Sequence, residues 1–145
     1  MSRVFVRILA AGALLGAGFI VGRVSSPAAV EAAQGARVFE LRTYTTHEGK
    51  LPALQTRFRD HTVALFTKHG MTNIGYWVPA DAPASQNTLI YVLAHSSREA
   101  AKKSWDAFRN DPDWQKARAA SEVPGPIVSK VESVFMNATD YSPLK

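Results

Sequence analysis

The order of strand-like and helix-like segments limits most strongly what this chain can fold into. Four segments have the alternating or uniformly apolar, β-branched and aromatic pattern of strands, and they are residues 38–45, 71–78, 88–95 and 127–135. An amphipathic helical pattern begins at Leu51 and ends at Gly70, and a second one is capped by Ser96 and Ser97. The order strand, helix, strand, strand, helix, strand predicts an α+β fold, namely a ferredoxin-like βαββαβ unit with a four-stranded antiparallel sheet.

This topology also predicts which side chains share a face of the sheet. The expected strand order is 4-1-3-2, with both helices on one face. Alternation along the first strand places Glu40, Arg42 and Tyr44 together, and the last strand, its neighbour, places Lys130 with Glu132. We expect the four charged residues of these two groups to form one cluster on the face that the helices leave open. That face must meet water, a ligand or a second sheet.

The first part of the chain differs in composition from the rest. Arg3 and Arg7 come before an uninterrupted run of apolar and small residues, 8–22. Its 15 residues fit the apolar region of a secretory signal peptide, about 7–15 residues, better than a membrane span of about 20. A small, proline-containing stretch follows and resembles a cleavage region, whereas Arg23 suits an uncleaved anchor. We predict that residues 1–36 are a signal peptide or N-terminal membrane anchor plus a linker.

The remainder is predicted to form a single domain. Residues 37–137 hold all the strand and helix patterns, and residues 138–145 read as an irregular C-terminal tail. We expect the domain to be exported, either periplasmic or secreted, or to be held outside the membrane by residues 8–22. Contact with a membrane is expected only through the N-terminal segment, if it stays uncleaved.

Composition excludes several classes of function. The chain has no cysteine, which excludes disulfides, thiolate catalysis and cysteine-ligated metals. The net charge is +5, but the basic residues are spread among acids and only Lys102 and Lys103 are adjacent, so nucleic acid is not an expected partner. Histidines and carboxylates do not occur at metal-ligand spacing, and glycine motifs for phosphate binding are missing from the sequence. We therefore predict neither a metal nor a cofactor.

A set of short motifs occurs in the order and spacing of a known family. They are FELRTYT in the first strand, KHG at the end of the first helix, NIGYW in the second strand, the strand Leu89–His95 leading to Ser97 and Arg98, and the box DPDWQ. Together these motifs make residues 38–135 resemble the NIPSNAP family. The resemblance implies a homodimeric α+β barrel, in which two ferredoxin-like sheets pack face to face around Glu40, Arg42 and Tyr44. It implies no agreed activity, because a fold does not convey a function.

Aromatic side chains supply the first candidates for a ligand site. Tyr44, Trp77 and Tyr91 come from three neighbouring strands and are expected to wall one apolar pocket, in which Arg42 and Asn73 supply polar contacts. Such a pocket would suit a planar or apolar small molecule. Core packing is the alternative role for these aromatic residues.

Two histidines complete the predicted pocket. His61 lies beside the apolar stripe of the first helix, where it could act as a base, reach a haem iron or simply hydrogen-bond at the sheet edge. His95 ends the third strand and is expected at the mouth of the pocket. The predicted ligand-pocket residues are Arg42, Tyr44, His61, Asn73, Trp77, Tyr91 and His95.

These patterns lead to two hypotheses about function. The first is a homodimeric module that binds a small apolar or aromatic molecule or serves as an interaction surface. The alternative is a cofactor-independent monooxygenase-like enzyme, in which Arg42, His61 and Trp77 hold an electron-rich aromatic substrate while oxygen reacts with it. The enzyme requires a closed, dry pocket that joins a polar group to the aromatic wall, and the binding module does not. The sequence assigns no catalytic residue.

The N-terminal pattern predicts export of the domain. A reporter that is active only after export, fused after Lys145, should be active, because residues 8–22 would direct the domain across the membrane. A silent reporter on an abundant fusion protein would show that this prediction is wrong.

Overall fold

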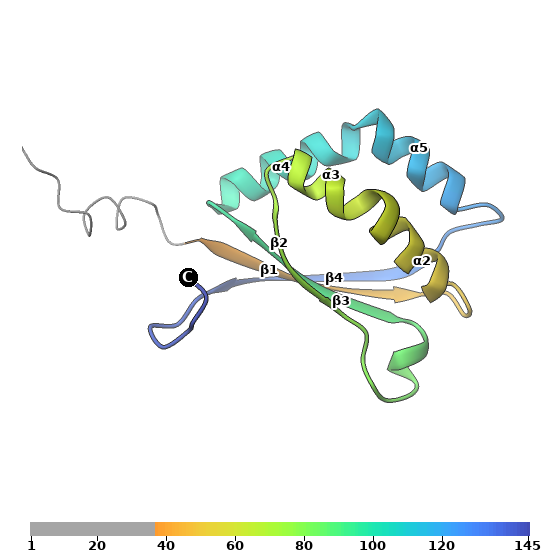
Figure 1. Ribbon diagram of the computed structural model, residues 1–145, viewed down its shortest axis with the longest axis horizontal. Coiled ribbons are helices and arrows are strands. Elements are labelled where there is room, and N and C mark those ends of the chain that lie inside the picture. Colours follow the sequence, from red (N-terminus) through yellow and green to blue (C-terminus); the bar gives the residue numbers. More distant parts are fainter. Residues whose placement is uncertain (1–36) are drawn as a thin grey trace, which may run out of the picture.

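A single four-stranded antiparallel sheet forms the base of the domain. The computed structural model describes residues 37–145 (Figure 1). The strands are β1 (Val38–Thr46), β2 (Thr72–Trp77), β3 (Thr88–His95) and β4 (Val128–Asn137). They lie in the order β2-β3-β1-β4, with antiparallel pairing throughout. The predicted strand order and the ferredoxin-like α+β fold are confirmed.

The helices cover one face of this sheet (Figure 1). The first helical stretch is continuous and consists of α2 (Leu51–Arg57), the π-helical turn η1 (Phe58–Thr62) and α3 (Val63–Lys68). The second comprises α4 (Arg98–Asn110) and α5 (Pro112–Ser121), and a short 3-10 turn, η2 (Ala84–Gln86), lies in the loop before β3. The sheet and the helical layer enclose the core between them.

Local sequence explains where these helices begin and end. Gly70 has a φ of +75°, the left-handed conformation that commonly ends a helix, just after α3. The Ser97 side chain accepts a hydrogen bond from the Ala100 amide and caps α4. Asp111 caps α5 in the same way, and Pro112 follows as the first helical residue.

An aromatic cluster fills the centre of the core. The Phe58 ring lies 5.2 Å from the Tyr91 ring, 5.8 Å from Tyr76, 6.0 Å from Tyr44 and 6.1 Å from Phe66, in edge-on arrangements. Aromatic pairs prefer this geometry because the positive ring edge meets the negative ring face. Tyr44 and Tyr91 therefore lie on the helix-covered face of the sheet.

The prediction that the four charged residues form one cluster on the open face is wrong. The indole of Trp105, on α4, donates a hydrogen bond to Glu40, so the side chains of Glu40 and Arg42 lie under the helices. Glu132 pairs with Thr43, and Lys130 with Thr45, which places both of these charges on the opposite face. The prediction assumed that charge avoids the helix-covered face. Burial is tolerated here because donors from neighbouring elements satisfy the Glu40 carboxylate.

A β-bulge in β2 changes which of its side chains share a face. Asn73 pairs with Leu93 and Gly75 with Val92, so Ile74 is an extra residue without a partner on β3. Simple alternation would place Asn73 and Trp77 on one face. The bulge instead turns Asn73 toward the helices and Trp77 toward the open face. The indole of Trp77 lies against Gly75, where an added Cβ would come within 2.5 Å of the ring.

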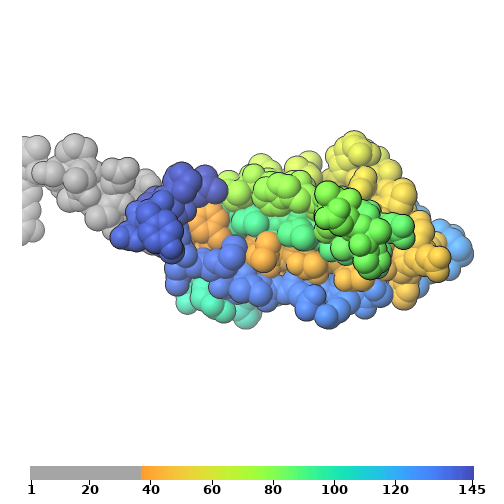
Figure 2. All heavy atoms as spheres, turned by 90° about the horizontal axis from the view of Figure 1, so that it is seen from below, coloured from red at the N-terminus to blue at the C-terminus, as the bar shows by residue number. Residues whose placement is uncertain are grey.

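The open face of the sheet is largely apolar. Its residues with large apolar side chains are Phe39, Leu41, Ile74, Trp77, Ile90, Val92, Val134 and Met136. Figure 2 shows this face, with the C-terminal tail at one end of it. The tail, residues 138–145, has neither helix nor strand, and its Leu144 lies near Phe39 in a shared pocket. Trp77 and Val134 are about half exposed, at 52% and 55%.

The predictions made for residues 1–36 fall outside the described part of the chain. They concern the signal peptide or membrane anchor and the apolar run 8–22. Within residues 37–145, none of the helices has the length and apolar character needed to cross a membrane.

Candidate functional site

A cavity between the helical layer and strands β1 and β4 combines arginines with aromatic rings. Its volume is about 310 Å³, at the lower end of the range for small-molecule pockets. We call it the arginine–aromatic cavity. Its lining residues are Arg42, Tyr44, Arg57, Trp105, Phe108, Arg109, Trp114, Arg118, Glu122, Pro126, Val128, Ser129, Lys130 and Val131.

Glu40 is the buried anion next to this cavity. Its Oε1 accepts hydrogen bonds from Arg42 Nη1 at 2.8 Å and Ser133 Oγ at 2.7 Å. Its Oε2 lies 2.7 Å from Trp105 Nε1 and 3.1 Å from His95 Nε2. The carboxylate thus joins β1 to β3, β4 and α4, although only 1% of the residue is exposed.

These contacts hold the Glu40 carboxyl in its charged form. Burial alone would raise its pKa, but hydrogen bonds from His95, Ser133 and Trp105 and the charge of Arg42 lower the pKa from 4.5 to about 2. A shift of this size corresponds to about 3 kcal/mol of folding stability at neutral pH. The stabilisation is complete above pH 4.5 and is lost as the pH falls through about 2.

Arg42 forms one wall of the cavity. Its guanidinium lies over the Trp105 ring at 4.2 Å and within 5.6 Å of the Tyr44 ring. Burial alone would lower the pKa of Arg42, but its surroundings, including Glu40, raise it, so the group remains charged. Its Nε is buried and finds no hydrogen-bond acceptor within residues 37–145.

Arg57 forms a second wall, from the end of α2. Its Nη1 donates to Glu122 Oε1 at 3.1 Å and Ser121 Oγ at 3.2 Å, and its guanidinium lies 5.2 Å from the Trp114 ring. The Arg57 Nε is likewise buried, and none of the described residues offers it an acceptor. Arg118 Nε donates to the other oxygen of Glu122, at 3.2 Å. One carboxylate is therefore shared by two arginines.

Four of the predicted pocket residues lie together near this cavity. Arg42 and Tyr44 line it, and Tyr91 packs against Tyr44 with 5.3 Å between ring centroids. His95 contacts Glu40 and is 2% exposed, so it is a buried partner of the carboxylate and does not lie at a pocket mouth. Burial raises the pKa of the Tyr91 hydroxyl well above its ordinary value, which keeps the hydroxyl neutral.

The other three predicted residues lie elsewhere. The Asn73 amide donates to Val63 O at 3.2 Å and Thr67 Oγ1 at 2.9 Å, which joins β2 to α3. Asn73 also accepts a hydrogen bond from the Tyr76 hydroxyl. His61 is exposed and lines a groove beside α5. Trp77 points away from the helices.

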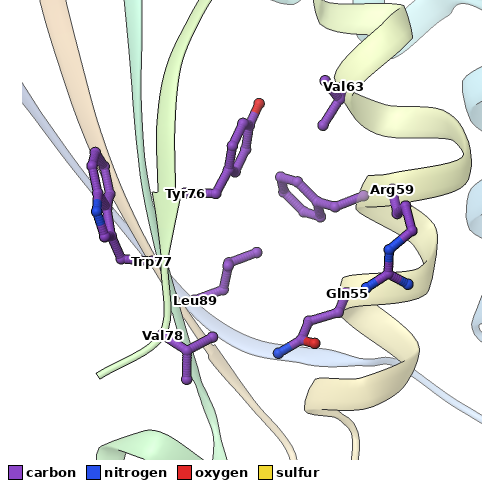
Figure 3. Close-up of a pocket in the computed structure, with 8 residues that line it drawn as sticks. Gln55, Arg59, Val63, Tyr76, Trp77, Val78 and Leu89 are labelled. Carbon is purple, nitrogen blue, oxygen red and sulfur yellow. The ribbon is translucent and has the colours of Figure 1, made fainter. Parts of the chain in front are cut away.

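Figure 3 shows a second cleft, between β2 and the first helical stretch. Tyr76 points from the strand toward the helix, whereas Trp77 lies on the other side of β2. Gln55 and Arg59 approach the cleft from α2 and η1. Its volume, about 310 Å³, equals that of the arginine–aromatic cavity, so volume does not distinguish the two sites. They differ in chemistry, because only the arginine–aromatic cavity is lined by buried charged side chains.

Sequence reasoning missed Arg57, Arg118 and Glu122. Arg57 carried a detectable signal, because it follows Leu51 and Leu54 at three-residue spacing and so falls beside the apolar stripe of the helix. A charged residue at such a position has to find a buried partner. The pairing with Glu122 had no comparable signal, since it joins residues 65 apart in the chain.

The fold and the site together define a ferredoxin-like α+β domain with an arginine-lined cavity between its sheet and its helices. The sequence profile of the NIPSNAP family matches residues 39–143. The chain belongs to this family. None of the proteins with a curated description matches the sequence.

Solved structures of similar fold include relatives from two groups. A NIPSNAP-family protein of unknown function from Agrobacterium tumefaciens has 22% identity and a TM-score of 0.66, over 76% of this chain and 95% of its own. A second one from that organism has 23% identity and a TM-score of 0.66, over 75% and 99%. A Streptomyces coelicolor monooxygenase, in complex with nanaomycin D, has 14% identity and a TM-score of 0.54, over 80% and 98%. These structural similarities establish the fold of the chain.

The Glu40 contacts generate a prediction about stability. We expect Glu40→Gln to lower the free energy of unfolding by about 3 kcal/mol at neutral pH, because the variant lacks the charge that its four neighbours stabilise. The difference between wild type and variant should shrink as the pH is lowered from 4.5 toward 2, where wild-type Glu40 becomes protonated. Urea unfolding followed by circular dichroism across this range measures both effects.

Glu48→Gln is the matched control for that measurement. Glu48 is exposed in the turn after β1, away from the open face, so its loss should cost less than about 1 kcal/mol. A difference between wild type and Glu40→Gln that stays constant down to pH 3 would contradict the assigned titration of Glu40.

Proposed function

We propose that this NIPSNAP-family domain binds a small aromatic molecule in the arginine–aromatic cavity. The observation that carries the proposal is the combination of aromatic walls with buried guanidinium groups. Tyr44, Trp105, Phe108 and Trp114 supply rings, and Arg42 and Arg57 supply fixed donors, which are the convergent polar groups that orient a ligand in an apolar pocket. The cleft of Figure 3, the pocket shared by Phe39 and Leu144, and the groove that His61 lines lack this combination.

The proposed binding site depends on a rigid frame. Glu40 fixes Arg42 and Trp105 on one wall, and Glu122 fixes Arg57 on the other. A site whose groups are already held in place loses little conformational freedom when a ligand enters. This arrangement favours binding over a purely structural role for the buried arginines.

We also propose that two copies of the domain pair through their open sheet faces. The support is the apolar character of that face, where Leu41 lies between Val92 and Val134 on the neighbouring strands. Contiguous apolar surface rimmed by polar residues marks an interaction site, and a second identical sheet is a self-complementary partner for it. This pairing would make the protein a homodimer. We also propose that the protein is exported, and the sequence pattern of residues 8–22 supports this.

A cofactor-independent monooxygenase-like enzyme is the second candidate. The similar fold of the Streptomyces coelicolor monooxygenase favours it, as does an aromatic wall that could hold an electron-rich ring. The lining of the arginine–aromatic cavity holds no histidine, so the base proposed at His61 lies outside it. Oxygen uptake that requires an aromatic compound and is lost when the cavity is blocked would move the protein into this class.

Binding in the arginine–aromatic cavity is tested with N-phenylnaphthylamine, a neutral dye whose fluorescence rises in apolar sites. We expect saturable binding to the wild-type protein. Ser129→Phe should abolish it, because the new ring would occupy space at the cavity lining. Ser96→Phe, at an exposed position before α4, is the control and should bind like wild type. Equal binding by both variants would contradict the proposed site.

Dimerisation is tested by light scattering coupled to gel filtration. We expect a dimer for the wild type and a monomer for Leu41→Glu, because the carboxylate would be buried without a partner between the two sheets. Ala119→Glu adds the same charge at an exposed position of α5 and should remain dimeric. A wild-type protein that is monomeric at high concentration would contradict the pairing of the open faces.

A further inference from the structure

We propose that the ligand of the arginine–aromatic cavity is an aromatic acid, an anion whose acidic group is held by arginines while its rings lie against the tryptophans. This inference rests on the proposed function and specifies the chemical class of the ligand. Three features of the cavity carry it: its charge balance, its unpaired donors and the position of its rings.

The charge balance around the cavity is positive. The cationic lining residues are Arg42, Arg57, Arg109, Arg118 and Lys130. Lys130 pairs with Glu132 on the open face, and the exposed Arg109 pairs with Asp106, which Lys102 also contacts, so these pairs are left out of the balance on the helix side. Among the described residues, the other three arginines are matched by two carboxylates, Glu40 and Glu122, and the shortfall is at Glu122. Its two oxygens are divided between Arg57, at 3.1 Å, and Arg118, at 3.2 Å.

Two buried N–H donors on arginines that line the cavity lack acceptors. They are Arg42 Nε and Arg57 Nε, neither of which is matched by any acceptor in residues 37–145. Both belong to side chains that are mostly buried, with exposures of 16% and 3%. Guanidinium groups bind carboxylates and related oxyanions through several parallel N–H donors, and such charge-assisted bonds are stronger than neutral ones. An acidic ligand beside these guanidinium groups supplies the missing charge.

The rings explain why the anion should be aromatic. Arg42 lies over Trp105 and Arg57 lies near Trp114, so each buried guanidinium is already positioned beside an indole. Phe108 joins the two tryptophans, with ring centroids 5.7 Å from Trp105 and 4.5 Å from Trp114. A simple inorganic anion would leave this apolar wall unused, whereas an aromatic acid contacts rings and cations together.

The experiment compares the neutral dye N-phenylnaphthylamine with anilinonaphthalene sulfonate, which has the same ring system and an added sulfonate. We expect the sulfonate to bind at least about tenfold more tightly, as one good charge-assisted hydrogen bond provides. This advantage should fall as sodium chloride is raised, because salt screens the attraction. The neutral dye should be insensitive to salt.

Three arginine variants locate the anion. Arg57→Gln should remove most of the advantage of the sulfonate, measured as the ratio of the affinities of the same variant for the two dyes. Arg118 is 60% exposed, so Arg118→Gln carries little risk to folding, and it should lower the advantage by about threefold. Arg59→Gln makes the same charge change in the cleft of Figure 3 and should have no effect. Circular dichroism confirms that each variant is folded.

The outcomes separate this inference from the proposed function. If both dyes bind equally and are blocked by Ser129→Phe, the cavity binds aromatic molecules but the requirement for an acid is wrong. If neither dye binds, or Ser129→Phe changes nothing, the proposed function fails and the inference with it. If Arg59→Gln, rather than Arg57→Gln or Arg118→Gln, removes the advantage, the anion binds in the other cleft and the inference is overturned.

Discussion

The Glu40 carboxylate connects most of the parts of this domain. It lies near the start of β1, under the helical layer, and receives hydrogen bonds from Arg42, Ser133 and Trp105, with His95 at hydrogen-bonding distance. A buried carboxylate is costly unless donors and opposite charge compensate it. Glu40 therefore constrains its neighbours as strongly as they constrain it. Helix α4 has to present the Trp105 indole toward β1, and β4 has to place Ser133 beside it.

The position of the arginine–aromatic cavity follows from this constraint. Arg42 is on the same face of β1 as Glu40 and is held by it, so the guanidinium points under the helices and forms a cavity wall over Trp105. At the other side, Arg57 is fixed by Glu122 at the end of α5. The helices thus do not pack on the sheet through apolar contacts alone. The Trp105 indole on α4 donates to Glu40 on β1 and so joins the two layers. The Arg42–Glu40 pair lies within β1, and the Arg57–Glu122 pair links α2 to the end of α5 within the helical layer.

The strand order, the helix boundaries and the family were accessible from sequence because they depend on local patterns. Alternating side chains, the Ser97 cap and the glycine after α3 each report on a few neighbouring residues. The faces of β1 were assigned wrongly because charge was taken to mean exposure, whereas Glu40 is buried with distant partners. Asn73 and Trp77 were predicted to share one pocket, but the bulge at position 74 interrupts the alternation of β2 and places them on opposite faces of the sheet. Errors of this kind arise wherever long-range contacts override a local rule.

The close approach of Trp77 to Gly75 has a consequence for the thickness of the proposed dimer. With hydrogen alone at position 75, the indole lies against the backbone of β2, and any larger side chain there would displace the ring. Packed sheets are separated by about 10 Å, a gap that interdigitating side chains of modest height fill. An indole displaced away from the sheet would hold two facing sheets apart like a spacer. By letting the ring lie against the backbone, a residue with no side chain would set how closely two copies of this protein can approach.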